Sequence, residues 1–430
     1  MRQSSFQSSE ELDRQQLAKL QAMLTAVNPA NRFYVKKLEQ AGFTGEVRTV
    51  NEFCRRMPFT SKRELVADQQ SHPPYGSNLT YPLDRYKRLS QTSATSGSPL
   101  RWLDTEDSWN WMLACWRRIF RMSGVRPADS VFFAFSFAPF LGFWTAFEAA
   151  VSLGCLSIPG GGLSSAARLA MILENGVTVL CCTPTYALRL AEVAGEENID
   201  LAKGQVRKII VAGEPGGSIP SVRARLENSW PGAQVLDHHG MTESGPVTYQ
   251  CPESSDCLHI LESDYIAEVV DPQSGEPAQE GQTGELVLTN LGRWGSPILR
   301  YRTGDLVRVL PRQVCRCGSQ ELALQGGILG RTDDTLFVRG VNLYPSAVEE
   351  ILRGFEGISE YCVEVDTQRV LPELRIQIEV SAACANPSAL AEMLQKRLAK
   401  AFTLRIPVLL VPAGTLPRFE MKARRWVRRS

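Results

Sequence analysis

Short apolar runs alternate with stretches of helical spacing between about residue 130 and residue 238. Each apolar run is rich in β-branched or aromatic residues, and the stretch after it repeats its apolar positions at helical intervals. A strand followed by a helix, several times over, is the pattern of right-handed βαβ units on a parallel sheet. The predicted strands are residues 131–137, 154–158, 178–184, 207–213 and 234–238, and the predicted helices are residues 141–153, 164–175, 186–195 and 221–230. We therefore expect an α/β fold with a parallel sheet.

After about residue 240 the helical spacing stops, and β-rich runs follow that are separated by turns of Gly, Pro and Asp. These runs are residues 265–271, 284–290, 305–310 and 321–326. They predict a β-rich subdomain. The pattern changes again near residue 330, where a small α+β domain is expected with helices at 346–354 and 386–402 and strands at 361–366, 373–380 and 407–412. We place the boundary at Asp333, so that a large domain spans residues 1–332 and a small C-terminal domain spans residues 333–430.

The composition is that of a soluble globular protein with more than one domain. The 430 residues are 43% hydrophobic and 22% charged, with a formal net charge of +1. That balance excludes the global basic field of a protein that binds nucleic acid or an anionic membrane. The N-terminus lacks the apolar core of a signal peptide, and Pro139 and Gly142 interrupt the apolar stretch 131–147. We therefore expect no membrane span and a cytoplasmic location.

Most of the eleven cysteines are scattered in apolar or helical contexts and predict buried thiols rather than a disulfide framework. Four others, Cys251, Cys257, Cys315 and Cys317, lie in the segments CPESSDCLHI and CRCG together with His259. Cys-x-Cys-Gly is a common metal-binding turn, and four nitrogen or sulfur ligands make a closed tetrahedral zinc site. The alternative is a group of reduced thiols and an imidazole near a surface turn.

A loop rich in hydroxyl side chains occupies residues 90–99, SQTSATSGSP. Its backbone and side chains can donate hydrogen bonds to phosphate oxygens. It is not a Walker loop, because the Gly-x4-Gly-Lys spacing is absent. Taken alone, the segment is equally well explained as a polar loop.

Further motifs follow this loop in order along the chain: AGEP (212–215), HHGMTESG (238–245), GELVLTN (284–290), YRTGD (301–305), GRTDD (330–334), RGVNLYPSAVE (339–349) and PRFEMKAR (417–424). The series resembles the adenylate-forming superfamily of acyl-CoA synthetases, adenylation domains and luciferases. RGVNLYPSAVE, the LHI at 258–260 and the short chain resemble the phenylacetate-CoA ligase family of aryl-CoA ligases in particular. The resemblance covers roughly residues 85 to 425, and the ordered set is far more specific than any single motif.

The resemblance implies an ATP-dependent acid–thiol ligase, which forms an acyl-adenylate and passes the acyl group to coenzyme A. A carboxylate must attack the α-phosphate, so two anions meet and need donors, cations and Mg²⁺. Glu243 would ligate Mg²⁺, Thr242 would contact the α-phosphate, and Asp305 would accept hydrogen bonds from the ribose hydroxyls. The implied nucleotide-binding residues are Thr92, Ser93, Thr95, Ser96, Gly97, Gly213, Glu214, Pro215, His239, Gly240, Asp305 and Arg331.

In the small domain the resemblance gives Lys422 the catalytic role of bridging the attacking carboxylate and the α-phosphate. The alternative is that Lys422 belongs to a solvated basic tail. Asp333 would be the hinge, and rotation about it would bring Arg339 and Gly340 to the coenzyme A thiol channel, where a glycine allows close approach.

Two positions of the phosphate loop depart from the family pattern. Ala94 stands where the first Gly is usual, and Ser98 stands where a Lys is usual, which removes a cation from the pyrophosphate end. Hydroxyl donors remain, so we expect weaker ATP binding rather than inactivity. A degenerate, non-catalytic nucleotide-binding homologue stays open as an alternative.

The resemblance places an acyl pocket along the Phe-rich stretch and the two segments after it, with Phe135, Phe140, Leu141, Trp144, Gly161 and His238 as lining residues. Such a lining suits an aromatic acid of the benzoate, anthranilate or phenylacetate type, although a stripe of Phe is also typical of plain core. His238 or Glu148 could bind an amino or hydroxyl substituent of the acid.

The family also has relatives with a Cys, the LHI histidine and a Cys-x-Cys pair. By that resemblance the zinc ligands are Cys251, His259, Cys315 and Cys317, and Cys257 is spare. The expected small-molecule partners are the aromatic acid, ATP with Mg²⁺, and coenzyme A. A separate carrier protein is the alternative acceptor, a downstream acyltransferase could consume the product, and the chain could form a homodimer.

Overall fold

The computed structural model describes residues 8–43, 46–92, 99–137, 139–333, 336–338, 341–366, 373–382, 384–419 and 423–429. Several residues with predicted roles lie outside these ranges: Ser93, Thr95, Ser96, Gly97, Arg339, Gly340 and Lys422. Among the described helices, none has both the length and the apolar character that crossing a bilayer requires.

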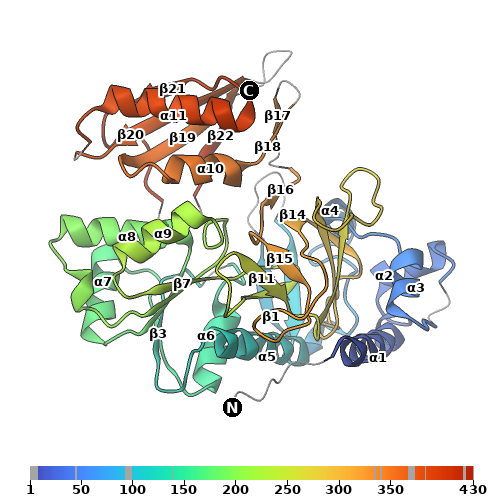
Figure 1. Ribbon diagram of the computed structural model, residues 1–430. Helices are drawn as coiled ribbons and strands as arrows, with labels where there is room; N and C mark the ends of the chain where they lie inside the picture. The colour runs from blue at the N-terminus through green and yellow to red at the C-terminus, as the bar shows by residue number, and fades with distance from the viewer. Residues whose placement is uncertain are drawn as a thin grey trace.

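A five-stranded parallel sheet in the order β4-β3-β5-β6-β7 forms the centre of the large domain, which confirms the predicted fold class (Figure 1). The strands are β3 (Ser130–Phe133), β4 (Leu156–Pro159), β5 (Val179–Cys182), β6 (Lys208–Val211) and β7 (Gln234–Asp237). The helices between them are α6 (Trp144–Ser152), α7 (Ser165–Glu174), α8 (Pro184–Glu196) and α9 (Pro220–Ser229), and a short 3-10 helix, η2 (Leu201–Lys203), precedes β6. Strands β3 and β5 are buried at every position, as expected for a parallel sheet covered on both faces.

The first strand is shorter than its apolar run predicted. Residues 131–137 were expected to be one strand, but β3 ends at Phe133. Phe133 is paired with Pro159, the last residue of β4, so β4 offers no further residue to extend the ladder. The remaining apolar residues therefore leave the sheet and enter the loop before α6.

The pattern made no prediction for the N-terminal third, which is largely helical. Ser8 and Ser61 begin helices with capping boxes, and both hydroxyls accept from the backbone of a Glu three residues later. The elements are α1 (Ser9–Val27), α2 (Arg32–Gln40), α3 (Val50–Arg56), α4 (Lys62–Ser71), η1 (Leu83–Arg85), the antiparallel pair β1 (Tyr86–Gln91) and β2 (Arg101–Thr105), and α5 (Glu106–Met122).

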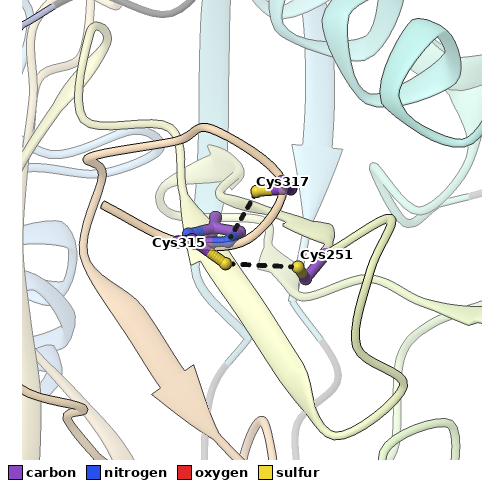
Figure 2. A group of neighbouring side chains, drawn as sticks. Cys251, Cys315 and Cys317 are labelled. Carbon is purple, nitrogen blue, oxygen red and sulfur yellow. Dashed lines mark hydrogen bonds between the residues drawn. The ribbon is translucent and has the colours of Figure 1, made fainter. Parts of the chain in front are cut away.

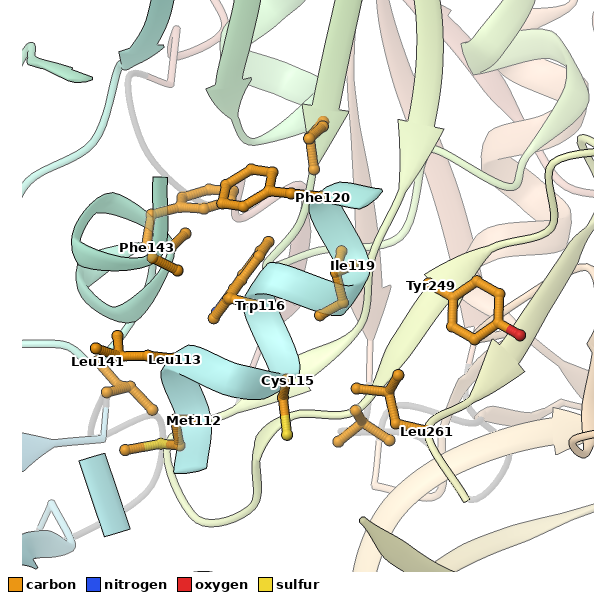
Figure 3. Packing of buried hydrophobic residues seen from close by; sticks show 14 of the residues in the cluster. Met112, Leu113, Cys115, Trp116, Ile119, Phe120, Leu141, Phe143, Tyr249 and Leu261 are labelled. Atoms are coloured by element: carbon orange, nitrogen blue, oxygen red, sulfur yellow. The ribbon is translucent and has the colours of Figure 1, made fainter. Parts of the chain in front are cut away.

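Two antiparallel sheets form the β-rich subdomain that was predicted after residue 240. One contains β12 (Tyr265–Val270), β13 (Thr283–Asn290), β14 (Tyr301–Arg308) and β16 (Gly330–Arg331), and the other contains β10 (Thr248–Gln250), β11 (Cys257–Ile260) and β15 (Ala323–Gln325). The short pair β8 (Gly240–Met241) and β9 (Gly245–Pro246) connects β7 to this region. Helix α5 packs its apolar face between the parallel sheet and β10–β11, so one core joins both parts (Figure 3).

The C-terminal domain has its own hydrophobic core. The hairpin β17 (Leu336–Val338) and β18 (Val341–Leu343) leads into a four-stranded sheet in the order β21-β20-β19-β22. These strands are β19 (Ile358–Asp366), β20 (Glu373–Val380), β21 (Val408–Leu410) and β22 (Trp426–Arg429), with helices α10 (Pro345–Arg353) and α11 (Pro387–Phe402). The last strand was not predicted, and Arg425 beside it is buried in an ion pair with Glu360, so this part of the tail is not a solvated basic segment.

Candidate active site

The predicted ligand-binding segments gather at one edge of the parallel sheet. Phe135 follows β3, Gly161 follows β4, residues 213–215 follow β6, and residues 238–240 follow β7. Carboxyl ends of parallel strands lie at the same edge, and α/β proteins bind their ligands in the crevice outside that edge. The segments that follow these four strands are distant in the sequence but therefore lie at the same edge of the sheet.

Glu243 is buried in the turn between β8 and β9, and two groups reach its carboxylate. The Tyr301 hydroxyl donates to Oε1 at 3.3 Å, and the Lys62 ammonium lies 3.3 Å from the same oxygen. Burial, with the nearby Glu243 charge, raises the pKa of Tyr301 well above its usual value, so its hydroxyl remains a donor. Lys62 has a side chain that is 45% exposed, which leaves the ammonium free to contact a bound anion. No sequence signal pointed to Lys62.

Two of the predicted nucleotide-binding residues lie beside the carboxylate of a third, Asp305. Asp305 on β14 is in register with Arg331 on β16, and Arg331 Nη1 donates to Oδ1 at 2.9 Å. His239 Nε2 lies 3.2 Å from Oδ2. A ribose that binds here must share the carboxylate with these groups. Asp333, the predicted hinge, also accepts from Arg331, at 3.0 Å.

Thr92 closes the base of the hydroxyl-rich loop. Its backbone N–H donates to the Leu100 carbonyl at 2.9 Å, and its hydroxyl accepts from the Leu100 N–H at 3.0 Å. These bonds hold the two ends of the loop together. Residues 93–98 between them lie outside the described part of the chain.

Glu214 was expected among the nucleotide-binding residues, and the structure directs its carboxylate to the junction of the two domains. Oε1 accepts from the Thr185 N–H at the start of α8, at 2.9 Å, and Oε2 accepts from the Ala423 N–H at 2.7 Å. Ala423 follows Lys422 directly in the chain. Gly213 before it has φ of +94°, a conformation that favours glycine. Pro215 continues the same turn.

Other contacts hold the C-terminal domain against α8 and α9. Glu350 on α10 accepts from the backbone N–H and the hydroxyl of Ser221, at 3.0 and 2.9 Å. Arg225 donates to the Ile358 carbonyl at 2.9 Å, and Arg425 donates to the Thr185 hydroxyl at 3.1 Å. Figure 1 shows the C-terminal domain resting on this side of the large domain. The hydrogen bonds described across this junction thus all involve polar or charged side chains.

His238 and an aromatic residue that sequence reasoning missed, Trp116 on α5, form the buried wall of the predicted acyl region. Their ring centroids lie 4.3 Å apart. His238 Nδ1 lies 2.7 Å from the Thr248 carbonyl, which can only accept, so Nδ1 carries the proton and Nε2 is left as an acceptor. Burial lowers the pKa of His238 to about 3, so the ring is neutral.

The other predicted acyl residues extend this wall along the loop before α6. The ring centroids of Phe143 and Trp116 lie 5.8 Å apart. Phe135 packs edge-on against Phe143, with a distance of 5.7 Å between their ring centroids. Gly161 packs closely, because an added Cβ would lie 3.2 Å from the Phe135 carbonyl oxygen. Leu141 is buried in the main core, Phe140 is half-buried, and Trp144 is 37% exposed with its indole N–H bonded to the Phe137 carbonyl. Leu141 and Phe143 belong to the same buried cluster as Trp116 (Figure 3).

The four predicted zinc ligands come together in the β-rich subdomain (Figure 2). Their ligand atoms all lie within 4.8 Å of one another, and the Cys251 and Cys315 sulfurs are 3.6 Å apart. Sulfurs bound to one tetrahedral zinc ion at ~2.3 Å would be about 3.8 Å apart. His259 Nδ1 donates to the Glu321 carbonyl at 3.2 Å, which turns Nε2 towards Cys317 at 3.5 Å. The donor set fits a zinc ion.

Cys257, the spare thiol, lies next to this cluster and influences it. Its hydrogen bond to Cys251 is the largest of several effects that lower the pKa of Cys251, and the same bond raises the pKa of Cys257. A thiolate is the form that binds a metal, so Cys251 is the ligand that these contacts favour.

Comparisons with known proteins agree with this arrangement. The family model described as "AMP-binding enzyme" matches residues 92–292, and the model described as "AMP-binding enzyme C-terminal domain" matches residues 340–429. A phenylacetate-coenzyme A ligase of Thermus thermophilus is 30% identical over 96% of this chain and 95% of its own length. The chain belongs to the AMP-binding enzyme family. Within it, this protein is an AMP-forming acid–coenzyme A ligase.

Solved structures of one relative distinguish two arrangements of the ligase. A 2-hydroxyisobutyryl-CoA ligase in the postadenylation state, in complex with 2-HIB-AMP, superposes with a TM-score of 0.93 at 28% identity, over 99% of this chain and 91% of that chain. The same relative in the thioesterification state, in complex with 2-HIB-AMP and CoA, gives 0.74 at 29% identity, over 98% and 90%. The coverages are nearly the same, so the lower score reflects a different arrangement, and this structure is more similar to the relative in its postadenylation state.

Removing one thiol of the cluster tests the metal site. The purified ligase is expected to contain about one zinc per chain by elemental analysis, and Cys315→Ser should lose most of it, because three remaining ligands hold the ion less tightly. Cys384→Ser, which changes a half-buried thiol in the C-terminal domain, is the control. Zinc content that is absent in the unaltered ligase, or equal in both variants, would contradict the assignment.

Lys62 is expected to contribute a cation to the nucleotide site, where Ser98 replaces the usual loop lysine. Lys62→Met should lower the rate of acid-dependent pyrophosphate release by about 10-fold, which corresponds to ~1.4 kcal/mol. Arg63→Met changes the next exposed cation and controls for the loss of surface charge. If the two variants release pyrophosphate equally fast, Lys62 has no role at the site.

Proposed function

We propose that this ligase activates an aromatic carboxylic acid, of the benzoate, anthranilate or phenylacetate type, and transfers it to coenzyme A. The observation that carries the proposal is the aromatic wall of Trp116, His238 and Phe143, which ends on the same chain segment as Glu243. Helix α5 contacts both ends of that segment. Trp116 touches His238, and Met112 lies so close to Gly245 that an added Cβ there would be 3.1 Å from its sulfur. A flat acid against the wall would therefore direct its carboxylate towards the Glu243 turn.

The first half-reaction joins two anions, and the site is equipped to neutralise them. The acid carboxylate oxygen attacks the α-phosphorus of ATP, the bond to the bridging oxygen breaks, and pyrophosphate leaves. When bound, Mg²⁺ would neutralise phosphate charge, and Glu243 is its candidate ligand, because a carboxylate oxygen suits a hard cation. Lys62 adds an ammonium beside that carboxylate, and Asp305 offers acceptors for the ribose hydroxyls. Thr242 and Gly240 are the further candidates for contact with the nucleotide.

In the second half-reaction a thiolate attacks the acyl carbon, and AMP leaves with the bonding electron pair. The proposal assigns Lys422 to the first step and the segment with Arg339 and Gly340 to the second, with Asp333 as the hinge between them. The polar junction at Glu214, Ser221 and Arg425 supports such an exchange, since hydrogen bonds of this kind are replaced by water on opening. The relative captured in two states supports it further.

The acid can be identified by pyrophosphate release across a panel. We expect benzoate, anthranilate or phenylacetate to give at least a 10-fold higher kcat/KM than 2-hydroxyisobutyrate and acetate. The reason is that a flat aromatic ring makes more apolar contact with the aromatic side chains than a small aliphatic acid does. Mass spectrometry should find the coenzyme A thioester of the same acid. A preference for 2-hydroxyisobutyrate would refute the aromatic assignment. If the ligase forms acyl-adenylate but no coenzyme A thioester, and a carrier protein becomes acylated, then the acceptor is a carrier protein.

Glu214 should matter for only one of the two half-reactions. Its bond to the Ala423 N–H holds the segment that carries Lys422, so Glu214→Ala is expected to slow adenylation about 10-fold or more, the loss of a charged hydrogen bond. Thioester formation from synthetic acyl-adenylate and coenzyme A should change less than about 2-fold. Glu197→Ala, an exposed carboxylate after α8, is the control. Equal losses in both half-reactions would mean that Glu214 supports the fold alone.

A further inference from the structure

Arg293 is a charged side chain buried completely within the ligase. It lies between β13 and β14, is 0% exposed, and forms a two-pronged ion pair with Asp104 on β2, which is also 0% exposed. Nε donates to one carboxylate oxygen and Nη2 donates to the other, each at 2.6 Å. The geometry is that of a bidentate pair, which fixes the plane of the guanidinium.

The third nitrogen of the same guanidinium holds the turn that carries Glu243. Nη1 donates to the Thr242 carbonyl at 2.6 Å and to the Glu243 carbonyl at 3.1 Å. The Trp102 ring covers the guanidinium, with its centroid 5.4 Å from Cζ. Asp104 therefore orients Arg293, and Arg293 in turn fixes the backbone at the two residues of the proposed α-phosphate and magnesium contacts.

Stability alone is a weak reason to bury such a pair. Desolvation of two charges offsets much of their attraction, and apolar pairs of similar volume are often as stable. What an apolar pair cannot supply is the bond from Nη1 to two adjacent carbonyls. The neighbouring Gly292 shows how closely this segment is held, because an added Cβ would lie 2.1 Å from the Trp111 ring.

The side chain of Glu243 is supported separately from its backbone. Tyr301 donates to the carboxylate at 3.3 Å, and Tyr265 donates to the Ser244 carbonyl at 2.9 Å. The backbone of the turn is thus held from one side by Arg293 and from the other by Tyr265. A metal ligand must be held in its productive orientation to within a fraction of an ångström, so rigid support of this turn has a direct effect on catalysis.

We propose that Asp104 and Arg293 are positioning residues for adenylation, which hold Thr242 and Glu243 in the orientation that binds Mg²⁺ and the α-phosphate of ATP. The proposal rests on the proposed role of Glu243. It assigns no direct contact with the substrate to either residue. Loss of the pair should therefore impair the use of Mg²⁺·ATP and leave the thiol step intact.

The test replaces the pair without leaving a buried charge unpaired. In the ligase with Asp104→Leu and Arg293→Met together, pyrophosphate release with acid and ATP should fall 10- to 100-fold, and the Mg²⁺ concentration for half-maximal rate should rise at least 3-fold. Thioester formation from synthetic acyl-adenylate and coenzyme A should change less than 2-fold. Arg293→Lys keeps the charge but has no planar fork, and it should recover only part of the rate with the same direction of Mg²⁺ shift.

Glu243→Gln separates this proposal from the role of Glu243. If that variant adenylates normally, the proposed role of Glu243 fails first. If Glu243→Gln is impaired while the double variant and Arg293→Lys keep the normal rate and Mg²⁺ dependence, the positioning proposal is overturned. Equal losses in both half-reactions would also overturn it, since they indicate structural support only. Should the double variant fail to fold, Arg293→Lys decides, and an unchanged Mg²⁺ dependence there refutes the proposal.

Discussion

The guanidinium of Arg293 has no access to water, so each of its sides must be satisfied by protein. That constraint joins three parts of the chain that are distant in sequence: β2 through Asp104, the turn after β8 through Thr242, and the segment before β14 that carries Arg293 itself. The same turn leads from the parallel sheet into the antiparallel sheets, where Asp305 and Arg331 pair. The turn that Arg293 holds therefore lies between the parallel sheet and the strands that carry Asp305 and Arg331.

The domain junction is built on a different principle. The hydrogen bonds described across it join polar groups, such as those of Glu214, Ser221 and Arg225, and the apolar cores of the two domains are separate. A junction of this kind is specific in geometry but inexpensive to open. Two separate cores joined through polar contacts suit a ligase whose relative was captured in two arrangements.

The cysteine and histidine cluster lies in the β-rich subdomain, where β11 contributes His259 and the turn before β15 contributes Cys315 and Cys317. Its polar neighbours form a second buried network, in which Glu321 accepts from Arg118 on α5 and from the Tyr249 hydroxyl. This network links the cluster to α5, the helix that also carries Trp116. The cluster is therefore connected through hydrogen bonds to the helix that packs against His238.

The pattern of apolar and polar residues along the chain was enough to predict most helices and strands. The alternation of apolar runs and helical spacing predicted the parallel sheet, the β-rich subdomain and most of the C-terminal domain, and the motif order indicated the family. The first strand was overestimated because its end depends on where β4 stops, and β22 was missed because its pairing with β19 cannot be read from a short charged segment. Boundaries that depend on a partner strand are not encoded in the strand itself.

Only the tertiary structure decided which residues support the proposed site residues. Lys62, Trp116, Asp104 and Arg293 stand in segments without a recognisable motif. Lys62, Trp116 and Arg293 each contact residues 238–245, and Asp104 acts on that segment only through Arg293. Glu214 belongs to a recognised motif, yet the direction of its carboxylate follows from where the C-terminal domain rests. The physical reason is the same in every case. Sequence spacing predicts which residue types occur on one element, whereas the register and packing of distant elements decide which of them share a buried charge.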